Sequence, residues 1–446
     1  MYDKTYDKAE RIRDVLRYIK KFKNSVIVIH LDDSVIDSPS FSSHIKDICY
    51  IHDSGLNIAI VPGAKKRIDD ILSNSDLTWQ TENGIRITTE TAIPLVKMAA
   101  FDVANRIMTS LAGQGKTAVI GNWVRARGKG ILNGIDYQFT GEIDKLQTES
   151  ISAILEKGFI PIFPCIGWNT LGKPYNISSI TLASEIAILL RAEKLFYLTN
   201  EGTITNTSFN IPDTISLSEE NTIPALNLEE TQELIDNNTS EITSIPNKEQ
   251  ILSLLKLGKH SCESGVSRVH ILDGTLDGTL PCEIFSDIGS GTMIYKNNYG
   301  SIRSMNRDDV PLVLNLMRPF IEKEILLPRS EEMLIAQVND YIVYEMDGGI
   351  KACASLHLYE SKQGEIAAVA VDQSCAHMGI GPKMITYLIN KATKENQDSV
   401  FVLTTQTADW FEQQGFKQDT VDSLPNERKQ YWSKKRGSAV LRLQLQ

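Results

Sequence analysis

The chain has 446 residues, and its 46 basic and 56 acidic side chains give a formal net charge of −10 at pH 7. This length suggests two or three domains, and the net negative charge argues against a broad nucleic-acid surface, because affinity for phosphate backbones comes mainly from clustered Lys and Arg. No stretch approaches the roughly 18 consecutive apolar residues of a membrane span, and the N-terminal residues are charged rather than an apolar signal segment. We therefore expect a cytoplasmic protein that acts on small molecules, with neither nucleic-acid nor membrane partners.

The cysteines and histidines form no metal-binding pattern. The six cysteines are scattered without a CxxC pair, and the seven histidines are equally dispersed. Structural zinc sites instead bring Cys and His together at short, regular spacings. The sequence predicts reduced, mostly buried thiols and no metal.

From Ser25 to Leu198 the chain alternates short β-branched runs with helical stretches. This alternation is typical of a parallel sheet with helices on its faces, and it predicts an α/β fold. Strands are expected at 25–30, 56–61, 117–121, 160–163 and 194–198, and helices at 45–52, after Gly63 and at 181–190.

Residues 203–247 are rich in Asn, Thr, Ser, Glu and Pro, a composition that predicts surface structure rather than core. A strand-like run returns at 266–272. It is followed by a helical stretch to Phe285 and a loop of small residues at 287–292.

A new pattern begins near Ser301, so a domain boundary is expected within 295–300. The segment predicts a strand and a helix, a hairpin made by 341–346 and 350–359, a strand at 364–371, an amphipathic helix after Gly379, a strand at 400–405, a short helix and a last strand at 439–445.

The loop between the apolar strand 366–371 and the following helix carries Gly379 and Gly381. Main-chain amides at such a turn can hold a pyrophosphate, and the same glycines equally suit a tight turn alone.

Two further features of this segment suggest chemistry. Glu365 stands at the start of the apolar strand, where a carboxylate can deprotonate an amine or simply be a solvated strand end. Arg428 and Arg436 lie in a cation-rich tail, and they suit a bidentate clamp on a dicarboxylate as well as ordinary solvated charge.

The order of elements after residue 300, with an aromatic-rich ADWFEQQGF helix end, resembles the Gcn5-related N-acetyltransferases. Together with the N-terminal half, the chain is similar to the bacterial N-acetylglutamate synthases, which join an amino-acid-kinase-like domain to such an acetyltransferase domain. The resemblance covers nearly the whole chain, and the matching runs include GNWVRARGKGILNGIDYQFTGEID, AEKLFYLTNEG, SGVSRVHILDG, IRSMNRDDV, LLPRSEE and FVLTTQTADWFEQQGF. It implies an amino-acid-kinase-like αβα sandwich at 1–295 and a catalytic N-acetyltransferase α/β domain at 300–446.

The resemblance also implies acetyl transfer from acetyl-CoA to the α-amine of L-glutamate, the first step of arginine biosynthesis, with no metal. Glu365 would be the general base, and Thr404 would help to protonate the CoA thiolate. The residues implied for the glutamate carboxylates and a main-chain contact are Arg329, Ala368, Arg428, Arg436 and Ser438. Those implied for acetyl-CoA are Val369, Ala370, Val371, Met378, Gly379 and Gly381, although Ala376 stands where the family usually has Gln or Arg.

The N-terminal domain departs from active kinases of its fold. His30, Asp32 and Asp33 follow the first strand, where those kinases have a Lys and glycines for ATP phosphates. Two carboxylates would repel a triphosphate, so we expect a kinase-inactive, regulatory domain.

In the family, that domain binds L-arginine. Members of the family are hexameric, so the resemblance also implies a homo-oligomer here. The residues implied for arginine are Tyr18, Lys194, His270, Glu283 and Gly289. The residues alone are equally consistent with His270 as an ordinary buried histidine and Glu283 as an ordinary surface glutamate. Two alternatives for the whole chain stay open, an acetyltransferase for another amino acid or amine and an arginine-sensing binding protein with a decayed catalytic domain.

Overall fold

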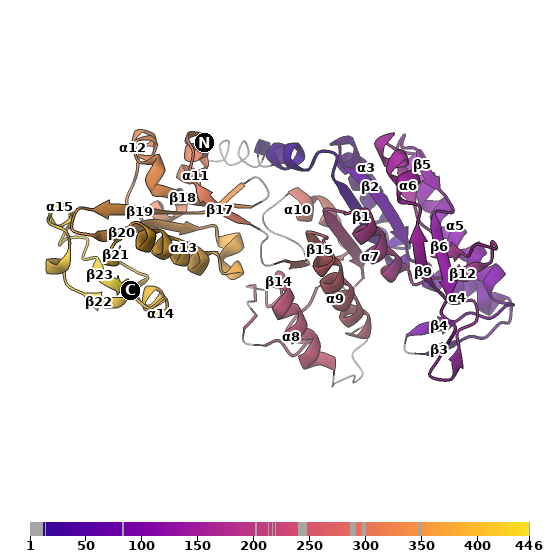
Figure 1. Ribbon diagram of the computed structural model, residues 1–446. Coiled ribbons are helices and arrows are strands. Elements are labelled where there is room, and N and C mark those ends of the chain that lie inside the picture. Colours follow the sequence, from indigo (N-terminus) through magenta and orange to yellow (C-terminus); the bar gives the residue numbers. More distant parts are fainter. Residues whose placement is uncertain are drawn as a thin grey trace. The chain divides into compact units, whose positions relative to one another are not determined.

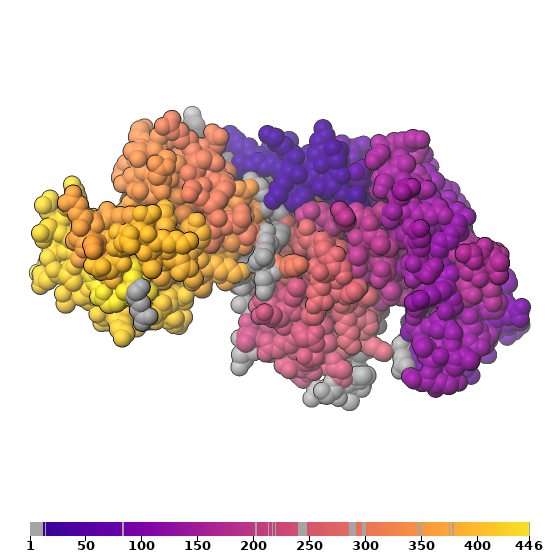
Figure 2. Space-filling view, in the orientation of Figure 1, coloured from indigo at the N-terminus to yellow at the C-terminus, as the bar shows by residue number. Residues whose placement is uncertain are grey.

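The computed structural model describes residues 12–13, 15–82, 84–200, 203–212, 214–215, 217–218, 220–239, 248–285, 291–296, 300–346 and 349–445. The chain separates into two compact units, Met1–Asn297 and Asn298–Gln446. Figure 2 shows that each unit is built from one continuous part of the chain, coloured indigo to pink in the first and orange to yellow in the second.

The N-terminal unit is organised around an eight-stranded sheet with the order β14-β16-β15-β13-β1-β2-β10-β5 (Figure 1). The six parallel strands are β1 (Val26–Leu31), β2 (Asn57–Pro62), β5 (Ala118–Ile120), β10 (Ile160–Ile162), β13 (Lys194–Thr199) and β15 (Arg268–Asp273). At one edge β16 (Thr292–Tyr295) runs antiparallel to β15, and β14 (Ala225–Asn227) pairs with β16.

Side chains of β1 alternate between two hydrophobic cores, one on each face of the sheet. Ile27, Ile29 and Leu31 enter one core, whereas Val28 enters the other, as the two-residue period of a strand requires. Helices α3 (Phe41–Asp53), α4 (Lys65–Asn74), α5 (Ile93–Ala112) and α10 (Thr279–Phe285) cover the first face; α6 (Thr148–Glu156), α7 (Ser179–Leu189), α8 (Leu228–Thr239) and α9 (Lys248–Glu263) cover the second. The predicted αβα sandwich is confirmed.

Smaller elements extend this unit. The short helix α2 (Asp33–Ile36) follows β1, and residues 15–22 are helical. A four-stranded sheet has the order β12 (Pro174–Asn176), β11 (Ile166–Trp168), β6 (Val124–Gly128) and β9 (Gly141–Leu146). Two hairpins pair β3 (Gln80–Glu82) with β4 (Ile85–Ile87), and β7 (Ile131–Leu132) with β8 (Ile135–Asp136).

The expectation that 203–247 lies outside the core is wrong for much of the segment. Strand β14 joins the main sheet, and Leu234 and Ile235 of α8 are buried in one of its cores. The buried Asn238 side chain bonds both to the amide and to the carbonyl of Asn210, with distances of 2.9 Å. The polar composition misleads because a few apolar residues at helical and strand spacing are enough to anchor an edge of the fold.

The C-terminal unit contains a seven-stranded sheet with the order β17-β18-β19-β20-β21-β23-β22. Its strands are β17 (Ser301–Ser304), β18 (Tyr341–Met346), β19 (Gly349–Tyr359), β20 (Gln363–Val371), β21 (Ser399–Thr404), β22 (Lys417–Asp419) and β23 (Ala439–Gln444). Neighbouring strands are antiparallel except β20 and β21.

Helices flank this second sheet. One apolar core joins α11 (Val310–Glu322) and α12 (Glu331–Ala336) to β18, β19 and β20, while α13 (Ile380–Lys394) also packs on β19 and β20. The short helices α14 (Ala408–Gln413) and α15 (Asn426–Lys429) follow β21 and β22. The predicted α/β acetyltransferase-like fold is confirmed, and α12, α15 and β22 are elements that the sequence patterns did not indicate.

Candidate functional site

The two parallel strands of the C-terminal sheet separate part-way along their length. Strand β20 pairs with β21 only from Gln363 to Glu365, opposite Ser399 to Phe401. Beyond Glu365, β20 continues to Val371 and pairs on its other side with β19, while β21 continues to Thr404 against β23. Main-chain groups of Val369–Val371 that point away from β19 therefore have no neighbouring strand among the described residues, which suits an extended ligand that pairs with the strand edge.

A β-bulge accompanies this separation. The β19–β20 register shifts between Cys353 and Ser355, and Ala368 has a φ of 52°. A left-handed conformation is unfavourable for alanine and is held here by packing, since Ala368 is buried in the core beneath α11. The bulge bends β20 at the point where it leaves β21.

Glu365 lies at the start of this separation and is only 5% exposed. Its Oε2 accepts hydrogen bonds from Nε of Arg428 at 2.7 Å and from the Tyr359 hydroxyl at 2.8 Å. Burial opposes the charge of Arg428, but the hydrogen bond and the charge of Glu365 outweigh it and raise the pKa of the guanidinium. Burial, followed by the charge of Glu365, likewise raises the pKa of Tyr359. Glu365 is thus a buried, paired carboxylate and not a solvated strand end.

Thr404 ends β21 at the same edge of the sheet. Its hydroxyl lies 2.7 Å from that of Thr407 and accepts from the Thr407 amide at 3.0 Å, so it also stabilises the turn before α14. Because Thr404 pairs with Ala439 across β21 and β23, Ser438 lies directly beside this strand end.

The two other predicted arginines are placed differently from Arg428. The guanidinium of Arg329 lies over the Tyr341 ring, 5.8 Å from its centroid, and Tyr341 belongs to the same core as Ala368. Arg436 donates to the carbonyl of Ile325 at 2.9 Å. The structure therefore brings Arg428 to Glu365, whereas Arg436 ties the C-terminal tail to the segment after α11.

The two glycines after β20, Gly379 and Gly381, have different structural roles. Gly379 precedes α13 with a φ of +64°, and a Cβ there would meet no atom within 4 Å. Gly381 lies in the first turn, where a Cβ would approach Cζ2 of Trp410 to 3.0 Å. Gly379 thus provides a left-handed turn with open space before a helix N-terminus, and Gly381 permits close packing against α14. Met378 precedes this turn, and its side chain is outside the described part of the structure.

A Ser–His–Asp arrangement lies on the neighbouring strand. Nδ1 of His357 lies 3.0 Å from Oδ2 of Asp340, and Nε2 lies 3.0 Å from Oγ of Ser355. The Ser355 side chain is fully buried and its hydroxyl donates to the carbonyl of Ala367 at 3.1 Å. A nucleophile must be reachable by its substrate, so this group supports the strands rather than hydrolysis.

In the N-terminal unit, four of the five residues implied for arginine are described, and they form two pairs. Nζ of the buried Lys194 lies 4.8 Å from the Tyr18 ring centroid, and Nδ1 of His270 lies 2.7 Å from Oε1 of Glu283. Burial lowers the pKa of His270 to about 4, although Glu283 opposes this change, so the ring is neutral near pH 7. Gly289, the fifth, lies outside the described residues.

Two aromatic residues that the sequence analysis missed each lie against one of these pairs. Phe196 stacks on His270 with centroids 4.7 Å apart, and the Phe22 ring lies 5.6 Å from Nζ of Lys194. Phe22 is one helical turn from Tyr18, with ring centroids 4.4 Å apart, so helical spacing offered a signal for it.

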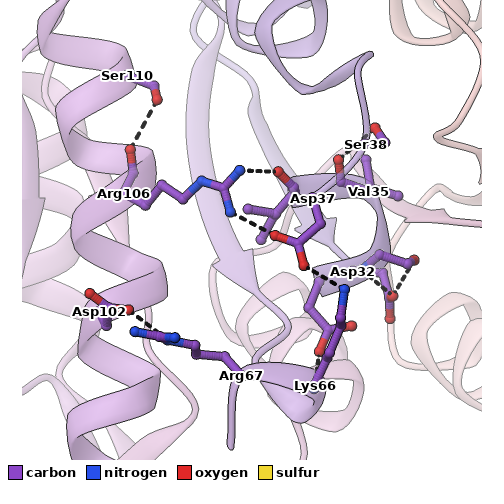
Figure 3. Close-up of polar contacts among 12 residues, drawn as sticks. Asp32, Val35, Asp37, Ser38, Lys66, Arg67, Asp102, Arg106 and Ser110 are labelled. Atoms are coloured by element: carbon purple, nitrogen blue, oxygen red, sulfur yellow. Dashed lines mark hydrogen bonds and ion pairs between the residues drawn. The ribbon is translucent and has the colours of Figure 1, made fainter. Parts of the chain in front are cut away.

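Charged side chains in and after the loops that follow β1 and β2 pair with one another (Figure 3). The Asp33 carboxylate accepts the amide of Lys66 in the first turn of α4, and Asp37 pairs with Lys66 at 3.0 Å and with Arg106 at 2.7 Å. Burial and Asp32 raise the pKa of Asp33 to about 6. An internal carboxylate therefore occupies the helix N-terminus, where a phosphate would otherwise be favoured.

Neither a metal cluster nor a membrane helix is found in the described residues. No three His, Cys, Asp or Glu side chains there gather as metal ligands would. Nor does any described helix combine the length and apolar character needed to cross a membrane.

Comparison with known proteins agrees with both folds. Residues 8–273 match the amino acid kinase family, and residues 312–416 match the acetyltransferase (GNAT) family. The amino-acid acetyltransferase of Actinobacillus pleuropneumoniae serotype 3 (strain JL03) is 31% identical over 434 residues, which cover 96% of each chain. The chain belongs to the amino-acid acetyltransferase family.

Solved structures extend this comparison. The N-acetylglutamate synthase from Neisseria gonorrhoeae, complexed with coenzyme A and L-arginine, is 29% identical with a TM-score of 0.76. The same enzyme complexed with coenzyme A and N-acetyl-glutamate is 30% identical with a TM-score of 0.60, and in both cases 98% of this chain and 99% of the other are covered. The amino-acid acetyltransferase family thus accounts for both units, and the expectation of an acyltransferase is confirmed.

Proposed function

We propose that this amino-acid acetyltransferase transfers the acetyl group of acetyl-CoA to the α-amine of L-glutamate, giving N-acetyl-L-glutamate and CoA, and so begins arginine biosynthesis. The observation that carries the proposal is the buried Glu365, held by Arg428 and Tyr359 where β20 and β21 separate. It lies in a chain with 30% identity, over nearly its whole length, to a synthase solved with CoA and N-acetyl-glutamate.

Acetyl-CoA fits the strand edge beyond Glu365. The pantetheine arm pairs with main-chain groups of Val369, Ala370 and Val371, and the pyrophosphate meets the amides of Met378, Gly379 and Gly381. These assignments are supported by the absence of a β21 neighbour along 366–371 and by the left-handed Gly379 before α13.

Glu365 acts as the general base. An ammonium group cannot attack a thioester, so Glu365 first takes one of its protons. The neutral amine nitrogen then forms a bond to the acetyl carbon, the C–S bond breaks, and the nitrogen loses a second proton as the amide forms, which is the proton that the thiolate takes up. Thr404, at the end of the neighbouring strand, helps to return a proton to the departing thiolate sulfur.

The glutamate carboxylates bind the cations around this strand end. Arg428 is supported most directly, because it already lies beside the base. Arg329, Arg436 and Ser438 contribute to the same pocket, with a main-chain contact at Ala368. Arg436 must then leave the carbonyl of Ile325 or contact the substrate with its other nitrogens.

The N-terminal unit, at 1–295, is a kinase-inactive sensor of L-arginine, and the unit at 300–446 is catalytic. The carboxylate of Glu283 suits a guanidinium, Lys194 suits a carboxylate, and the aromatic rings of Tyr18 and Phe22 border the site. Gly289 completes this assignment. Asp33, by occupying the first turn of α4, supports the loss of phosphate binding.

The enzyme acts in the cytoplasm as a homo-oligomer, and the family resemblance implies a hexamer. Sedimentation velocity of the full chain, with and without L-arginine, tests this part of the proposal. A monomer under both conditions would contradict it.

A thiol-release assay tests the reaction. Purified full-length protein is mixed with acetyl-CoA and a panel of amino acids, each with and without L-arginine. We expect release with glutamate alone and a changed rate when arginine is present. Because coupling is reciprocal, glutamate or acetyl-CoA should change arginine affinity by the same factor if arginine changes theirs.

The assay separates the alternatives. Turnover of another amine in place of glutamate would reassign the substrate, and glutamate turnover that ignores arginine would contradict the sensor. Arginine binding without turnover of any amine would identify a binding protein.

A further inference from the structure

The predicted base is held through only one of its two oxygens. Both the Tyr359 hydroxyl and Nε of Arg428 donate to Oε2 of Glu365. Oε1 accepts no hydrogen bond from any residue that the structure describes. It is not among the buried side-chain atoms that lack a hydrogen-bond partner, so solvent can reach it. Oε1 is therefore the oxygen that can receive a proton.

Tyr359 is well fixed for this task. It ends β19 and faces Gln363 across a tight turn, so its side chain lies on the same face of the sheet as Glu365. Its ring packs against the fully buried Phe401, with centroids 5.9 Å apart. This packing does not need the hydroxyl, whose described contact is with Glu365.

Arg428 uses only one side of its guanidinium on Glu365. Its Nε makes the 2.7 Å bond, and its terminal nitrogens make no hydrogen bond to any described residue. Those two nitrogens can bind a carboxylate bidentately while Nε still holds the base. Tyr359, by contrast, is not needed for the substrate carboxylate.

We propose that Tyr359 is a positioning residue for acetyl transfer, which holds Oε2 of Glu365 together with Arg428 and so directs Oε1 to the amine. The inference rests on the proposed function for its kinetic consequence. Its structural part, a hydrogen bond from Tyr359 to Glu365, stands independently.

Other charged groups near Glu365 are already engaged or more distant. His357, opposite Glu365 in the β19–β20 register, is paired with Asp340 and Ser355. The charge of Glu427, which is next to Arg428 on α15, also raises the pKa of Tyr359. Its effect is smaller than those of burial, Glu365 and Arg428. On the β21 side, Glu365 faces the apolar Phe401.

Replacement of Tyr359 by phenylalanine tests the proposal. Tyr359→Phe keeps the ring and removes one hydrogen bond to a carboxylate. We expect kcat to fall about threefold to tenfold, with the KM for glutamate unchanged. Tyr387→Phe, at an exposed position on α13, is the matched control and should leave both quantities unchanged.

A second measurement does not depend on activity. In full-length protein with ¹³Cζ-labelled tyrosine, the Tyr359 signal is the one that Tyr359→Phe removes. At neutral pH the chemical shift of this signal should change in Glu365→Gln, because the hydroxyl loses its charged acceptor, whereas the Tyr387 signal should not move.

The outcomes distinguish the two claims. Glutamate turnover with parental kcat in Tyr359→Phe would overturn the positioning role and leave the proposed function intact. If the parent protein does not acetylate glutamate, the proposed function fails. The labelled tyrosine then decides the contact, because a Tyr359 signal insensitive to Glu365→Gln would overturn it.

Discussion

Glu365 combines features that a general base requires. It is buried, yet one oxygen remains free of described hydrogen bonds, and its partners keep the side chain in one orientation. Removal of this carboxylate would leave the half-buried Arg428 guanidinium without its described side-chain partner.

Replacement of this carboxylate should therefore affect chemistry more than binding. We expect Glu365→Gln to lower kcat by about 10² to 10⁴-fold, the usual contribution of a positioned base, with a smaller change in the KM for acetyl-CoA. Thiol release at saturating substrates measures this. Glu360→Gln, at an exposed position before β20, should retain parental kcat. A Glu365→Gln enzyme as active as the parent would remove the base assignment.

At the scale of elements, the β-bulge in β20 is the feature that shapes the site. Its φ of 52° at Ala368 bends the strand where β21 departs, and Ala368 is packed beneath α11 and cannot relax freely. A β-branched side chain tolerates this backbone region poorly and would also add volume to the core.

We expect Ala368→Val to lower the free energy of unfolding by about 1–3 kcal/mol and to raise the KM for acetyl-CoA, because the strand edge that we propose for pantetheine begins there. Urea denaturation of the full chain and steady-state kinetics measure the two effects. Ala367→Val, in extended and half-buried backbone one residue earlier, is the matched control and should stay within about 0.5 kcal/mol of the parent. Equal effects of the two substitutions would argue against strain at the bulge.

At the scale of the whole molecule, the two units carry different kinds of buried charge. The C-terminal unit pairs Glu365 with Arg428, whereas the N-terminal unit buries three of its described histidines, of which His30 and His270 have pKa values that burial lowers to about 4. In the unfolded chain a histidine titrates near pH 6.5. Protonation between these values therefore favours unfolding, and the stabilising contribution of each neutral histidine is complete above pH 6.5 and lost as the pH falls toward 4.

Asp33 acts in the opposite direction. Its raised pKa, about 6, contributes stability that is lost as the pH rises from 3.8 toward 6. Among the described groups of the N-terminal unit, the lowered pKa values of His30, His270 and His52 oppose the raised pKa values of Asp33 and Asp47 in this range. We therefore expect the N-terminal unit to become less stable on acidification from pH 6.5 to 4.5, with each unmatched proton contributing at most about 1.4 kcal/mol per pH unit.

Hydrogen–deuterium exchange of the full chain, corrected for the intrinsic rate at each pH, measures this change in β13 and β15. His270→Gln should make protection of these strands depend less on pH. His260→Gln, at an exposed position on α9, should not alter the dependence. Protection that does not change between pH 6.5 and 4.5 would contradict the expectation.

Hydrophobic patterning in the sequence predicted the central elements of both units. Alternating β-branched and helical runs predicted five strands of the main sheet between Ser25 and Leu198, and the pattern after Ser301 predicted the central strands and α13, whereas α5 and the four-stranded sheet were not predicted. These predictions hold because hydrophobic periodicity is a local property. The composition of 203–247, by contrast, hid β14 and α8, since only a few of its residues contact the core.

Part of the site was also readable in this way. The sequence indicated Glu365 as a carboxylate at the start of an apolar strand, although this position also suited a solvated strand end. Tyr359 was also predictable, because the predicted hairpin places its side chain on the same face of the sheet as Glu365.

The tertiary structure alone decided which groups act together. Arg428 is 63 residues from Glu365, and only the placement of the tail after β22 brings its Nε to the carboxylate. The separation of β20 from β21 and the left-handed Ala368 have no local signature, because alanine normally favours neither a bulge nor a positive φ. Local sequence specifies each element, but strand register and the meeting of distant side chains are set by packing across the whole unit.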